Sequence, residues 1–424
     1  MILKKHIFEN GLRLLMIPQA QNLAATVLVI VKAGSEYETK KINGISHFLE
    51  HMVFKGTRRR PNPGDISREL EAMGAEYNAF TGREWTMYYA KSEKGNMHRI
   101  LDMVTDMYQD PLLDSAEIEK EKGVIIEEIN LYEDTPARKV HDLFAQLLYG
   151  DQPAGWDIAG SKKIVRSLKR EDFWKYRKKH YVPAGTIVVV AGAFSPAKIK
   201  KEIGRTMGQL SAGKSVRKPR TIQVQKHFRA TVKFKDSQQS HLVLGFPACD
   251  TFDKRRHALR VLAEILGGGM SSRLFTRIRE EMGAAYYVRA EEEFLMDHGY
   301  FAISAGVEIN KIEPVIKEII KELARVKNEL VPKKELEKAK GHLLGGLVLG
   351  LETSDDLASF YGGQEAMTGR PLSPAEITRT VKQVTSEEVR KVARDFLLSH
   401  KLNLAVIGPY RKEAPFRKLL KLPL

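Results

Sequence analysis

The chain has 424 residues, a formal net charge of +16 and a single cysteine, Cys249. The length allows two or three domains of ordinary size, and a hydrophobic fraction of 43% excludes wholesale disorder. One cysteine excludes an internal disulfide framework and a thiolate metal cluster. Any transition-metal site therefore has to be built from His, Asp and Glu side chains.

The N-terminal residues contain no apolar segment of signal-peptide length. No stretch long enough to cross a bilayer is free of charge or strong polarity. We therefore expect a soluble, cytoplasmic protein with no membrane partner. The charge of +16 has two interpretations at this point. It either attracts nucleic acid or acidic ligands, or it forms a solvated basic surface.

The first half of the chain alternates between strand and helix patterns. Apolar and β-branched runs bounded by Gly and Pro predict strands at 12–18, 25–33, 76–80, 86–90 and 186–192. Helices are predicted after Gly44 and at 65–73, 97–108 and 115–133, and they occupy most of 138–180. Asp114 is the expected N-cap of the longest helix, with Glu117 as its capping-box partner.

The second half repeats the first. Residues 116–129 align with residues 334–347, and each segment follows a helix and a turn that contains Pro111 or Pro332. The numbering offset is 218 between Gly123 and Gly341, and it is 216 between Gly192 and Gly408, which close the last strands. A nearly constant offset over such a distance indicates a duplicated domain.

We therefore expect an α+β fold of two tandem related domains, each a mostly antiparallel sheet with helices packed on it. Between Gly213 and Lys235 the sequence has eight Lys/Arg and no acid, and its first part is expected to be a solvated linker. The expected boundaries are 1–211 for the first domain, 212–224 for the linker and 225–424 for the second domain.

A cluster of potential metal ligands follows Gly44. His47 and His51 are four residues apart on a predicted helix, which places both imidazoles on one face where they can chelate one ion. Glu50 lies beside them, within reach of a metal-bound water, and the order H-x-x-E-H is the inverzincin pattern. A partly exposed helix face is the alternative for this motif alone.

The repeat identifies a third ligand, because a duplicated domain that lost its chemistry should differ at the lost site. Three carboxylates of the first copy vanish in the second while the apolar frame is kept. The replaced pairs are Glu121/Ala339, Glu127/Gly345 and Glu128/Gly346. Glu121 and Glu128 share a helix face and Glu127 is rotated away, which fits Glu128 as ligand and Glu121 as its outer-shell support. Simple surface charge is the alternative.

These segments resemble the pitrilysin-type zinc metallopeptidases, in particular small bacterial members similar to mitochondrial processing peptidase. The resemblance is carried by residues 44–57, 78–86 and 121–129 and extends over nearly the whole chain. It implies one Zn²⁺ per chain bound by His47, His51 and Glu128, since the family's spacing between the second His and the third ligand leads from His51 to Glu128. It also implies Glu50 as the general base.

The resemblance implies substrate-binding residues as well. The strand that contains Asn78 and Ala79 is similar to the family's edge strand, which pairs with the substrate backbone. In the second domain, Arg279 and Tyr286 match the family residues that reach the substrate and assist catalysis. Tyr287 departs from the small residue usual at its position, so either tyrosine could be the active one.

The implied function is a zinc metalloendopeptidase that hydrolyses peptides or short unfolded segments in an enclosed chamber. A chain that carries both motifs resembles homodimeric members, in which the second domain completes the partner's site. The alternative is a metal-free scaffold or partner subunit of a peptidase complex, although such subunits usually lack the intact ligand set. No nucleic-acid partner is expected, because no basic recognition motif with interleaved aromatics is present.

Overall fold

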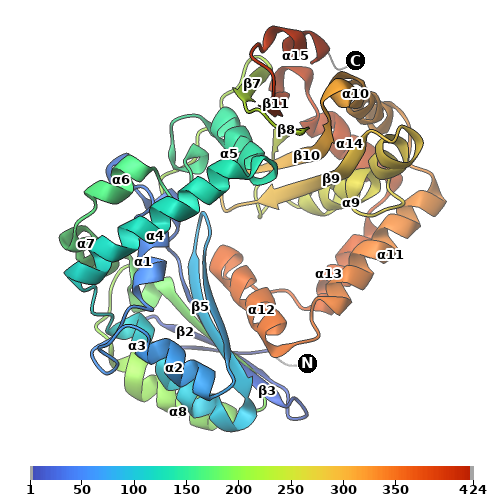
Figure 1. The fold of residues 1–424 in the computed structure, drawn as a ribbon. Coiled ribbons are helices and arrows are strands. Elements are labelled where there is room, and N and C mark those ends of the chain that lie inside the picture. Colours follow the sequence, from blue (N-terminus) through green and yellow to red (C-terminus); the bar gives the residue numbers. More distant parts are fainter. Residues whose placement is uncertain (1–2, 421–424) are drawn as a thin grey trace. The chain divides into compact units, whose positions relative to one another are not determined.

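The computed structural model describes residues 3–420, which fold into two compact units (Figure 1). Unit 1 comprises Met1–Asn130, Trp156–Pro219 and Gly350–Leu372. Unit 2 comprises Leu131–Gly155, Arg220–Leu349 and Ser373–Leu424. Each unit therefore contains segments from both halves of the sequence.

Unit 1 is built on a six-stranded sheet with the order β1-β2-β6-β3-β5-β4. Its strands are β1 (Lys4–Ile7), β2 (Arg13–Pro18), β3 (Ala24–Val31), β4 (Glu76–Thr81), β5 (Thr86–Glu93) and β6 (Thr186–Gly192). Strands β2 and β6 pair in parallel, and the other neighbours pair antiparallel. Strand β4 lies at one edge, so only one of its sides is hydrogen-bonded within the sheet.

Unit 2 is built on a five-stranded sheet with the order β7-β11-β8-β10-β9. Its strands are β7 (Arg229–Phe234), β8 (Gln239–Ala248), β9 (Ala285–Phe294), β10 (Gly299–Glu308) and β11 (Asn403–Gly408). Again one pair, β7 and β11, is parallel and the rest are antiparallel. The order matches that of unit 1 without β1, which confirms the predicted α+β fold of two related domains.

Helices cover both sheets. Those of unit 1 are α1 (Ile45–Met52), α2 (Asp65–Ala72), α3 (Met97–Gln109), α6 (Lys162–Ser167), α7 (Arg170–His180), α8 (Pro196–Thr206) and α12 (Ser354–Thr368). Those of unit 2 are α5 (Pro136–Tyr149), α9 (Arg256–Gly267), α10 (Ile312–Asn328), α11 (Lys333–Leu349), α13 (Pro374–Gln383), α14 (Ser386–Phe396) and α15 (Ala414–Leu419). Helix α4 (Ser115–Asp134) belongs to unit 1 up to Asn130. Asp114 caps it as predicted, accepting hydrogen bonds from the backbone N–H groups of Ala116 and Glu117.

The two units exchange one helix. Helix α5 follows α4 along the chain but packs on β8 and β11 of unit 2, and α12 follows α11 but packs on β3 and β6 of unit 1. The expected contiguous domains, 1–211 and 225–424, therefore differ from the compact units at these two segments. The physical reason is burial of apolar side chains: Phe144 of α5 packs against sheet residues of unit 2, and Tyr361 of α12 packs against sheet residues of unit 1.

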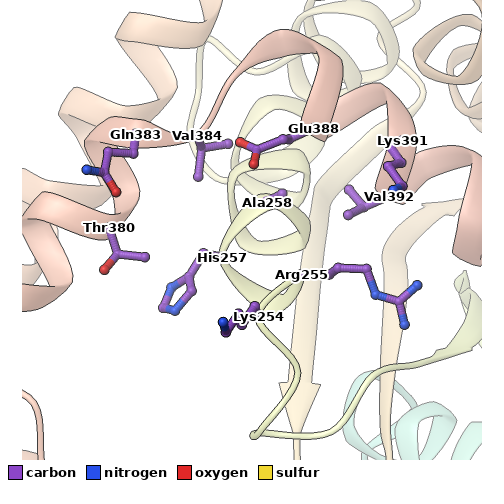
Figure 2. A pocket seen from close by; sticks show the side chains of 10 residues that line it. All are labelled: Lys254, Arg255, His257, Ala258, Thr380, Gln383, Val384, Glu388, Lys391 and Val392. Carbon is purple, nitrogen blue, oxygen red and sulfur yellow. The ribbon is translucent and has the colours of Figure 1, made fainter.

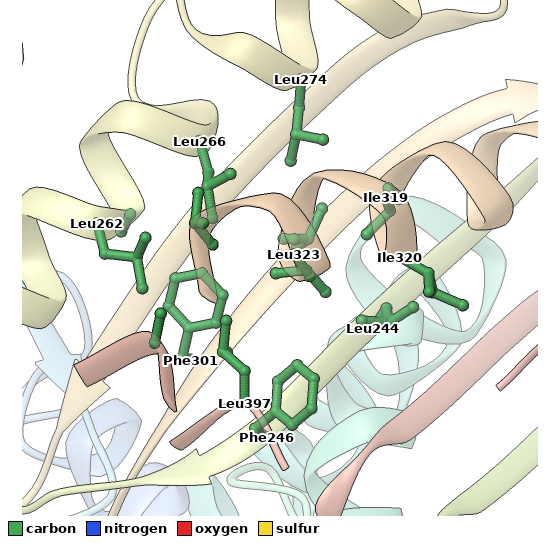
Figure 3. Packing of buried hydrophobic residues seen from close by; sticks show 14 of the residues in the cluster. Leu244, Phe246, Leu262, Leu266, Leu274, Phe301, Ile319, Ile320, Leu323 and Leu397 are labelled. Carbon is green, nitrogen blue, oxygen red and sulfur yellow. The ribbon is translucent and has the colours of Figure 1, made fainter. Parts of the chain in front are cut away.

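The cores are formed by the buried faces of these sheets and helices. In unit 1 the sheet residues Leu28, Ile30 and Val189 pack against Tyr361 of α12. In unit 2 a larger cluster gathers around Phe246 and Phe301, and Figure 3 shows its helix residues closing over the sheet. Among residues 3–420 there is no helix whose length and apolar character would let it cross a bilayer.

Candidate active site

Helix α1 separates its apolar and ligand-bearing residues onto two faces. Its buried face includes Phe48, which meets the ring of Phe173 edge-on, and Ser46, which shares a 2.7 Å hydrogen bond with the hydroxyl of Tyr176. The helix begins at Gly44, whose φ of 98° is left-handed and favours glycine. The opposite face carries His47, Glu50 and His51.

A buried carboxylate fixes the start of this helix. Glu38 accepts hydrogen bonds from the backbone N–H groups of Gly44 (2.7 Å) and Ser46 (2.8 Å), which are otherwise unpaired at a helix N-terminus. Burial raises the pKa of Glu38 to about 7, although these hydrogen bonds oppose the shift. The side chain thus works as an N-cap supplied from an earlier turn of the chain.

Helix α4 brings Glu128 to the two histidines. Its Oε2 lies 3.5 Å from the Nε2 of His47 and 3.5 Å from the Nε2 of His51. All the potential ligand atoms of this trio lie within 4.8 Å of one another, and the three side chains are half-buried. The structure thus brings together the three residues predicted to be ligands.

The trio fits a tetrahedral metal ion. Zinc binds His nitrogen and carboxylate oxygen at roughly 2.0–2.2 Å, so two ligands of one ion stand about 3.3–3.6 Å apart. The observed separations of 3.5 Å match this spacing and are longer than ordinary hydrogen bonds. Three converging donors also leave a fourth position for water, as in catalytic zinc sites.

Glu121 supports this arrangement from behind. Its Oε1 lies 3.0 Å from the Nδ1 of His51, and its Oε2 forms a 2.6 Å ion pair with Lys55. A carboxylate at Nδ1 selects the tautomer whose Nε2 lone pair faces the ligand position. Burial lowers the pKa of His51, but Glu121 and Glu128 outweigh it and raise that pKa to about 9. Burial alone would raise the pKa of Glu128, but His47 and His51 outweigh it and hold that pKa well below its usual range.

Glu50 is held by the edge of the sheet. The hydroxyl of Thr81, the last residue of β4, donates a hydrogen bond to the Glu50 carboxylate. Asn78 and Ala79 lie three and two residues earlier on the same strand, where they pair with β5 on one side only. The candidate base and the predicted substrate strand are therefore connected through one side chain.

Arg279 and Tyr286 are neighbours in unit 2. The Arg279 guanidinium carbon lies 5.8 Å from the Tyr286 ring centroid and 4.8 Å from that of Phe275, in the π-helical turn η7 (Phe275–Glu281). Val307 of β10 pairs with Ala285 while Gly306 pairs with Tyr287, so Tyr286 is the extra residue of a β-bulge. Tyr286 is 74% exposed, whereas the hydroxyl of Tyr287 lies 3.1 Å from the Nδ1 of His241. Tyr286 is thus the more exposed of the two tyrosines, whereas Tyr287 is half-buried and lines a hollow together with Arg279.

A hollow of about 510 Å³ lies in unit 2 between α9, α13 and α14, and none of the residues described above lines it (Figure 2). Two of the charged groups that line it have partners within the fold. Arg255 pairs with Asp253 and Asp395, and Glu388 caps α14 through the backbone N–H of Thr385. Burial, with Arg256 and Arg260 nearby, lowers the pKa of His257 on its wall to about 4. The hollow contains none of the predicted site residues and, among the described residues that line it, no cluster of ligands.

Three supporting residues were missed in the sequence. Lys55 had a detectable signal, since it lies in the segment 44–57 that carries the family resemblance, although α1 ends before it at Met52. Thr81 lies inside the segment 78–86 that carries the family resemblance, but its contact with Glu50 depends on how β4 packs against α1. Glu38 gave no signal, because a carboxylate that caps a helix from an earlier turn matches no local motif.

The chain is similar in sequence to known peptidases over most of its length. Residues 13–162 match the family described as insulinase (peptidase family M16), and residues 167–343 match the peptidase M16 inactive domain. An uncharacterized zinc protease of Bacillus subtilis is 34% identical over 411 residues, covering 96% of this chain and 98% of the relative. One of Streptomyces coelicolor is 34% identical over 420 residues, covering 98% and 91%.

Solved structures agree on the fold. A protease from Helicobacter pylori superposes with a TM-score of 0.90 at 23% identity, covering 96% of this chain and 99% of that one. A peptidase M16 inactive domain from Pseudomonas fluorescens gives a TM-score of 0.88 at 19% identity, covering 97% and 99%.

Proposed function

The chain belongs to the insulinase family of peptidases, family M16, and we propose that it is a zinc-dependent endopeptidase acting on peptides or short unfolded segments. The observation that carries this proposal is the convergence of His47, His51 and Glu128 within 4.8 Å. These residues would hold one Zn²⁺ per chain. The ion supplies Lewis-acid chemistry, lowering the pKa of a bound water and polarising the scissile carbonyl.

The protein's own groups then have distinct tasks. Glu50 takes the proton of the attacking water and passes it to the leaving amine. Thr81 holds the Glu50 carboxylate in one orientation through its hydrogen bond. Glu121, itself held by Lys55, keeps His51 in the ligating tautomer.

Substrate binding is assigned to two further elements. The open side of β4 at Asn78 and Ala79 would pair with an extended peptide backbone, as edge strands do. Tyr286 and Arg279 would stabilise the developing oxyanion or hold the substrate carbonyl. The exposure of Tyr286 on its bulge supports this role over one for Tyr287.

The direct test is the Glu50→Gln variant. It should retain zinc at wild-type stoichiometry and lose at least about a thousandfold in kcat against an unstructured peptide library, because the proton acceptor is gone. Glu127→Gln is the matched control, since Glu127 is exposed and hydrogen-bonded to Asn130 on another face of α4. Wild-type turnover by the Glu50→Gln protein would disprove the assignment.

We further propose a homodimer that encloses a chamber, in which the Arg279/Tyr286 pair of one subunit serves the zinc site of its partner. Mixing inactive Glu50→Gln with inactive Arg279→Ala subunits should then restore part of the activity in heterodimers. Heterodimers demonstrated by mass spectrometry that regain none would contradict action in trans.

A metal-free scaffold subunit is the second candidate, because one of the structural relatives is described as an M16 inactive domain. The presence of the full ligand trio favours the enzyme. Metal analysis after purification without chelators separates the two functions. A zinc content near zero that added zinc cannot restore would favour the scaffold.

A further inference from the structure

Helices α6 and α7 of unit 1 carry a concentration of positive charge that the proposed hydrolysis does not use. Residues 162–179 contain nine Lys/Arg and two acidic residues, a net charge of +7 in a chain whose total is +16. Nearly half of the net charge therefore belongs to this one short segment. Figure 1 shows the two helices consecutive in the chain, near α1 and α4.

Seven of these cations are exposed, and Arg170 is the one of them whose side chain is hydrogen-bonded to backbone carbonyls. The other six form no ion pair with a carboxylate of residues 3–420. They are Lys163, Arg166, Lys169, Lys175, Lys178 and Lys179. Of the two acids in the segment, Asp172 accepts a hydrogen bond from the backbone N–H of Lys169 at the start of α7. We call the six cations and Trp174 the α6–α7 basic face.

Trp174 lies in this face and is 37% exposed. The guanidinium carbons of Arg170 and Arg177 lie 6.0 Å and 5.8 Å from its ring centroid. Both arginines are anchored to backbone carbonyls, Arg170 to Leu113 and Arg177 to Gln109. Two anchored guanidinium groups therefore flank the indole, which remains partly exposed.

Ordinary helix chemistry accounts for part of this charge only. Cations in the last turn of α7, such as Lys178 and Lys179, interact favourably with the helix dipole. That argument does not reach Lys163 or Lys175. The duplicated pair in unit 2, α13 and α14, provides the comparison: residues 374–396 contain five Lys/Arg and four acids, a net charge of +1. The same structural role thus requires no excess of cations.

We propose that the α6–α7 basic face docks unit 1 onto the surface of an anionic phospholipid bilayer. Five of the six free cations are lysines, whose compact ammonium groups respond to a diffuse negative potential and lack the planar fork for bidentate phosphate recognition. An exposed tryptophan among lysines suits the interface between headgroups and acyl chains. Stacking of a nucleic-acid base would need an open indole face, which Arg170 and Arg177 restrict.

This binding is peripheral, so it is compatible with the lack of a membrane-spanning helix among the described residues. It is independent of the proposed peptidase activity, because the basic face contains none of the metal or substrate residues. Each lysine near an anionic surface contributes about a fivefold increase in affinity. Removal of four should weaken binding by roughly two to three orders of magnitude.

The test is cosedimentation of the full chain with vesicles of phosphatidylcholine alone or of phosphatidylcholine mixed with phosphatidylserine, at low and high salt. The quadruple variant K163Q/K175Q/K178Q/K179Q should lose binding to the anionic vesicles. The matched control R379Q/K382Q/R390Q/K391Q removes the same number of charges from α13–α14 and should bind like the wild type. Thermal unfolding checks that both variants fold.

Three results would overturn the proposal. The first is no binding of the wild type to anionic vesicles at low salt. The second is equal weakening by both variants, which would mean that net charge alone acts. The third is a preference of the α6–α7 basic face for an oligonucleotide or poly-glutamate of equal charge over the vesicles.

Discussion

Helices α4 and α11 occupy the same place in the two duplicated domains but differ in what they carry. With the offset of 218, buried Ile118 corresponds to buried Leu336, and buried Glu121 corresponds to buried Ala339. A buried apolar residue thus occupies the same position in both copies, whereas the carboxylates of Glu121, Glu127 and Glu128 have no counterpart in α11. The same helical frame is therefore formed with or without these carboxylates.

The partner helices α1 and α9 also differ in what they carry. In unit 2 a carboxylate on the first helix, Glu264, lies 2.6 Å from the Nδ1 of His342 on α11. In unit 1 the histidines lie on α1 and the carboxylate on α4, whereas in unit 2 the carboxylate lies on α9 and the histidine on α11. A hollow of about 320 Å³ beside the unit 2 pair is lined by one histidine, His342. One histidine and one carboxylate in contact form an ion pair or a hydrogen bond, whereas a catalytic zinc site needs three converging ligands.

The largest expected effect tests whether metal binds in unit 1 and not in unit 2. Glu128→Gln should lower zinc affinity by more than about a hundredfold and abolish peptide hydrolysis, because it removes a charged ligand. His342→Ala in unit 2 should leave both zinc content and activity unchanged. Metal analysis by mass spectrometry after dialysis measures this. Loss of zinc in His342→Ala would show that the metal binds in unit 2.

The exchanged helices α12 and α5 differ in how they are anchored. In unit 1, Arg13 of β2 donates to the fully buried carboxylate of Glu365 on α12, 3.1 Å away, and Lys5 binds the same carboxylate. In unit 2 the corresponding arginine of β7, Arg229, donates to the backbone carbonyl of Leu147 on α5 at 3.0 Å. The first anchor is a buried ion pair and the second is a neutral hydrogen-bond acceptor at a helix end.

Breaking these anchors should therefore affect the units unequally. Arg13→Gln leaves a buried carboxylate with half of its compensation and should destabilise unit 1 by about 3 kcal/mol. Arg229→Gln frees carbonyls that water can reach and should destabilise unit 2 by about 1 kcal/mol. The protein contains its own reporters, since all three tryptophans, Trp85, Trp156 and Trp174, lie in unit 1 and Cys249 lies in unit 2. If Arg13→Gln shifted the urea midpoint of the tryptophan signal by no more than Arg229→Gln shifts that of Cys249 labelling, the two anchors would not differ in strength.

Packing under the exchanged helices is also complementary between the units. At Gly362 of α12 an added Cβ would lie 2.7 Å from the Cδ1 of Ile30, the flexible end of a side chain. At Gly245 of β8 it would lie 2.5 Å from the backbone oxygen of Phe301 and 2.7 Å from the ring of Phe144 on α5. In unit 1 the glycine that permits close packing of helix and sheet lies on the helix, and in unit 2 it lies on the sheet.

Alanine at these two positions should sharpen that contrast. Gly245→Ala should destabilise unit 2 by about 2 kcal/mol, because a paired strand cannot move its carbonyl away. Gly362→Ala should change the stability of unit 1 by less than about 1 kcal/mol, since the gain in helix propensity offsets a yielding contact. Urea unfolding followed by tryptophan fluorescence and by Cys249 labelling measures both. A larger effect at Gly362 would show that Ile30 cannot adjust.

The sequence was most informative where the chemistry is local. His47, Glu50 and His51 lie close together on one short helix, and the offset of 218 identified Glu128 and Glu121 on the corresponding helix. Strand and helix positions followed from apolar periodicity with small errors at their ends. These features depend on neighbours along the chain or on comparison of the two copies.

Features that depend on tertiary pairing could not be predicted. The exchange of α5 and α12 could not be predicted from either helix, because the sheet that buries its apolar residues is formed by segments distant in the chain. The bulge that exposes Tyr286 arises from the register between β9 and β10, which a single strand does not determine. Thr81 and Glu38 act through contacts with α1 that no sequence spacing indicates.

The smallest expected effect concerns the single thiol. Burial, with some contribution from Asp253, raises the pKa of Cys249 from 9.0 to about 12. Between these values the unfolded chain loses the thiol proton first and binds fewer protons than the folded one, so the stability of unit 2 falls as pH rises. Below pH 9 the contribution is present in full. Labelling with a thiol reagent at pH 8 should therefore be slow in the native protein and should report unfolding.

Replacement of the thiol isolates this contribution from that of other alkaline groups. Urea midpoints of wild type and Cys249→Ala, measured by circular dichroism at pH 8 and pH 10, should lie closer together at pH 10, because only the wild type loses the thiol term. Other alkaline groups, such as half-buried Tyr287, titrate equally in both proteins and cancel in the difference. A separation that stays constant between the two pH values would mean that the thiol is solvated in the folded unit. Since unit 1 contains no cysteine, its tryptophan transition should not respond to the substitution at either pH.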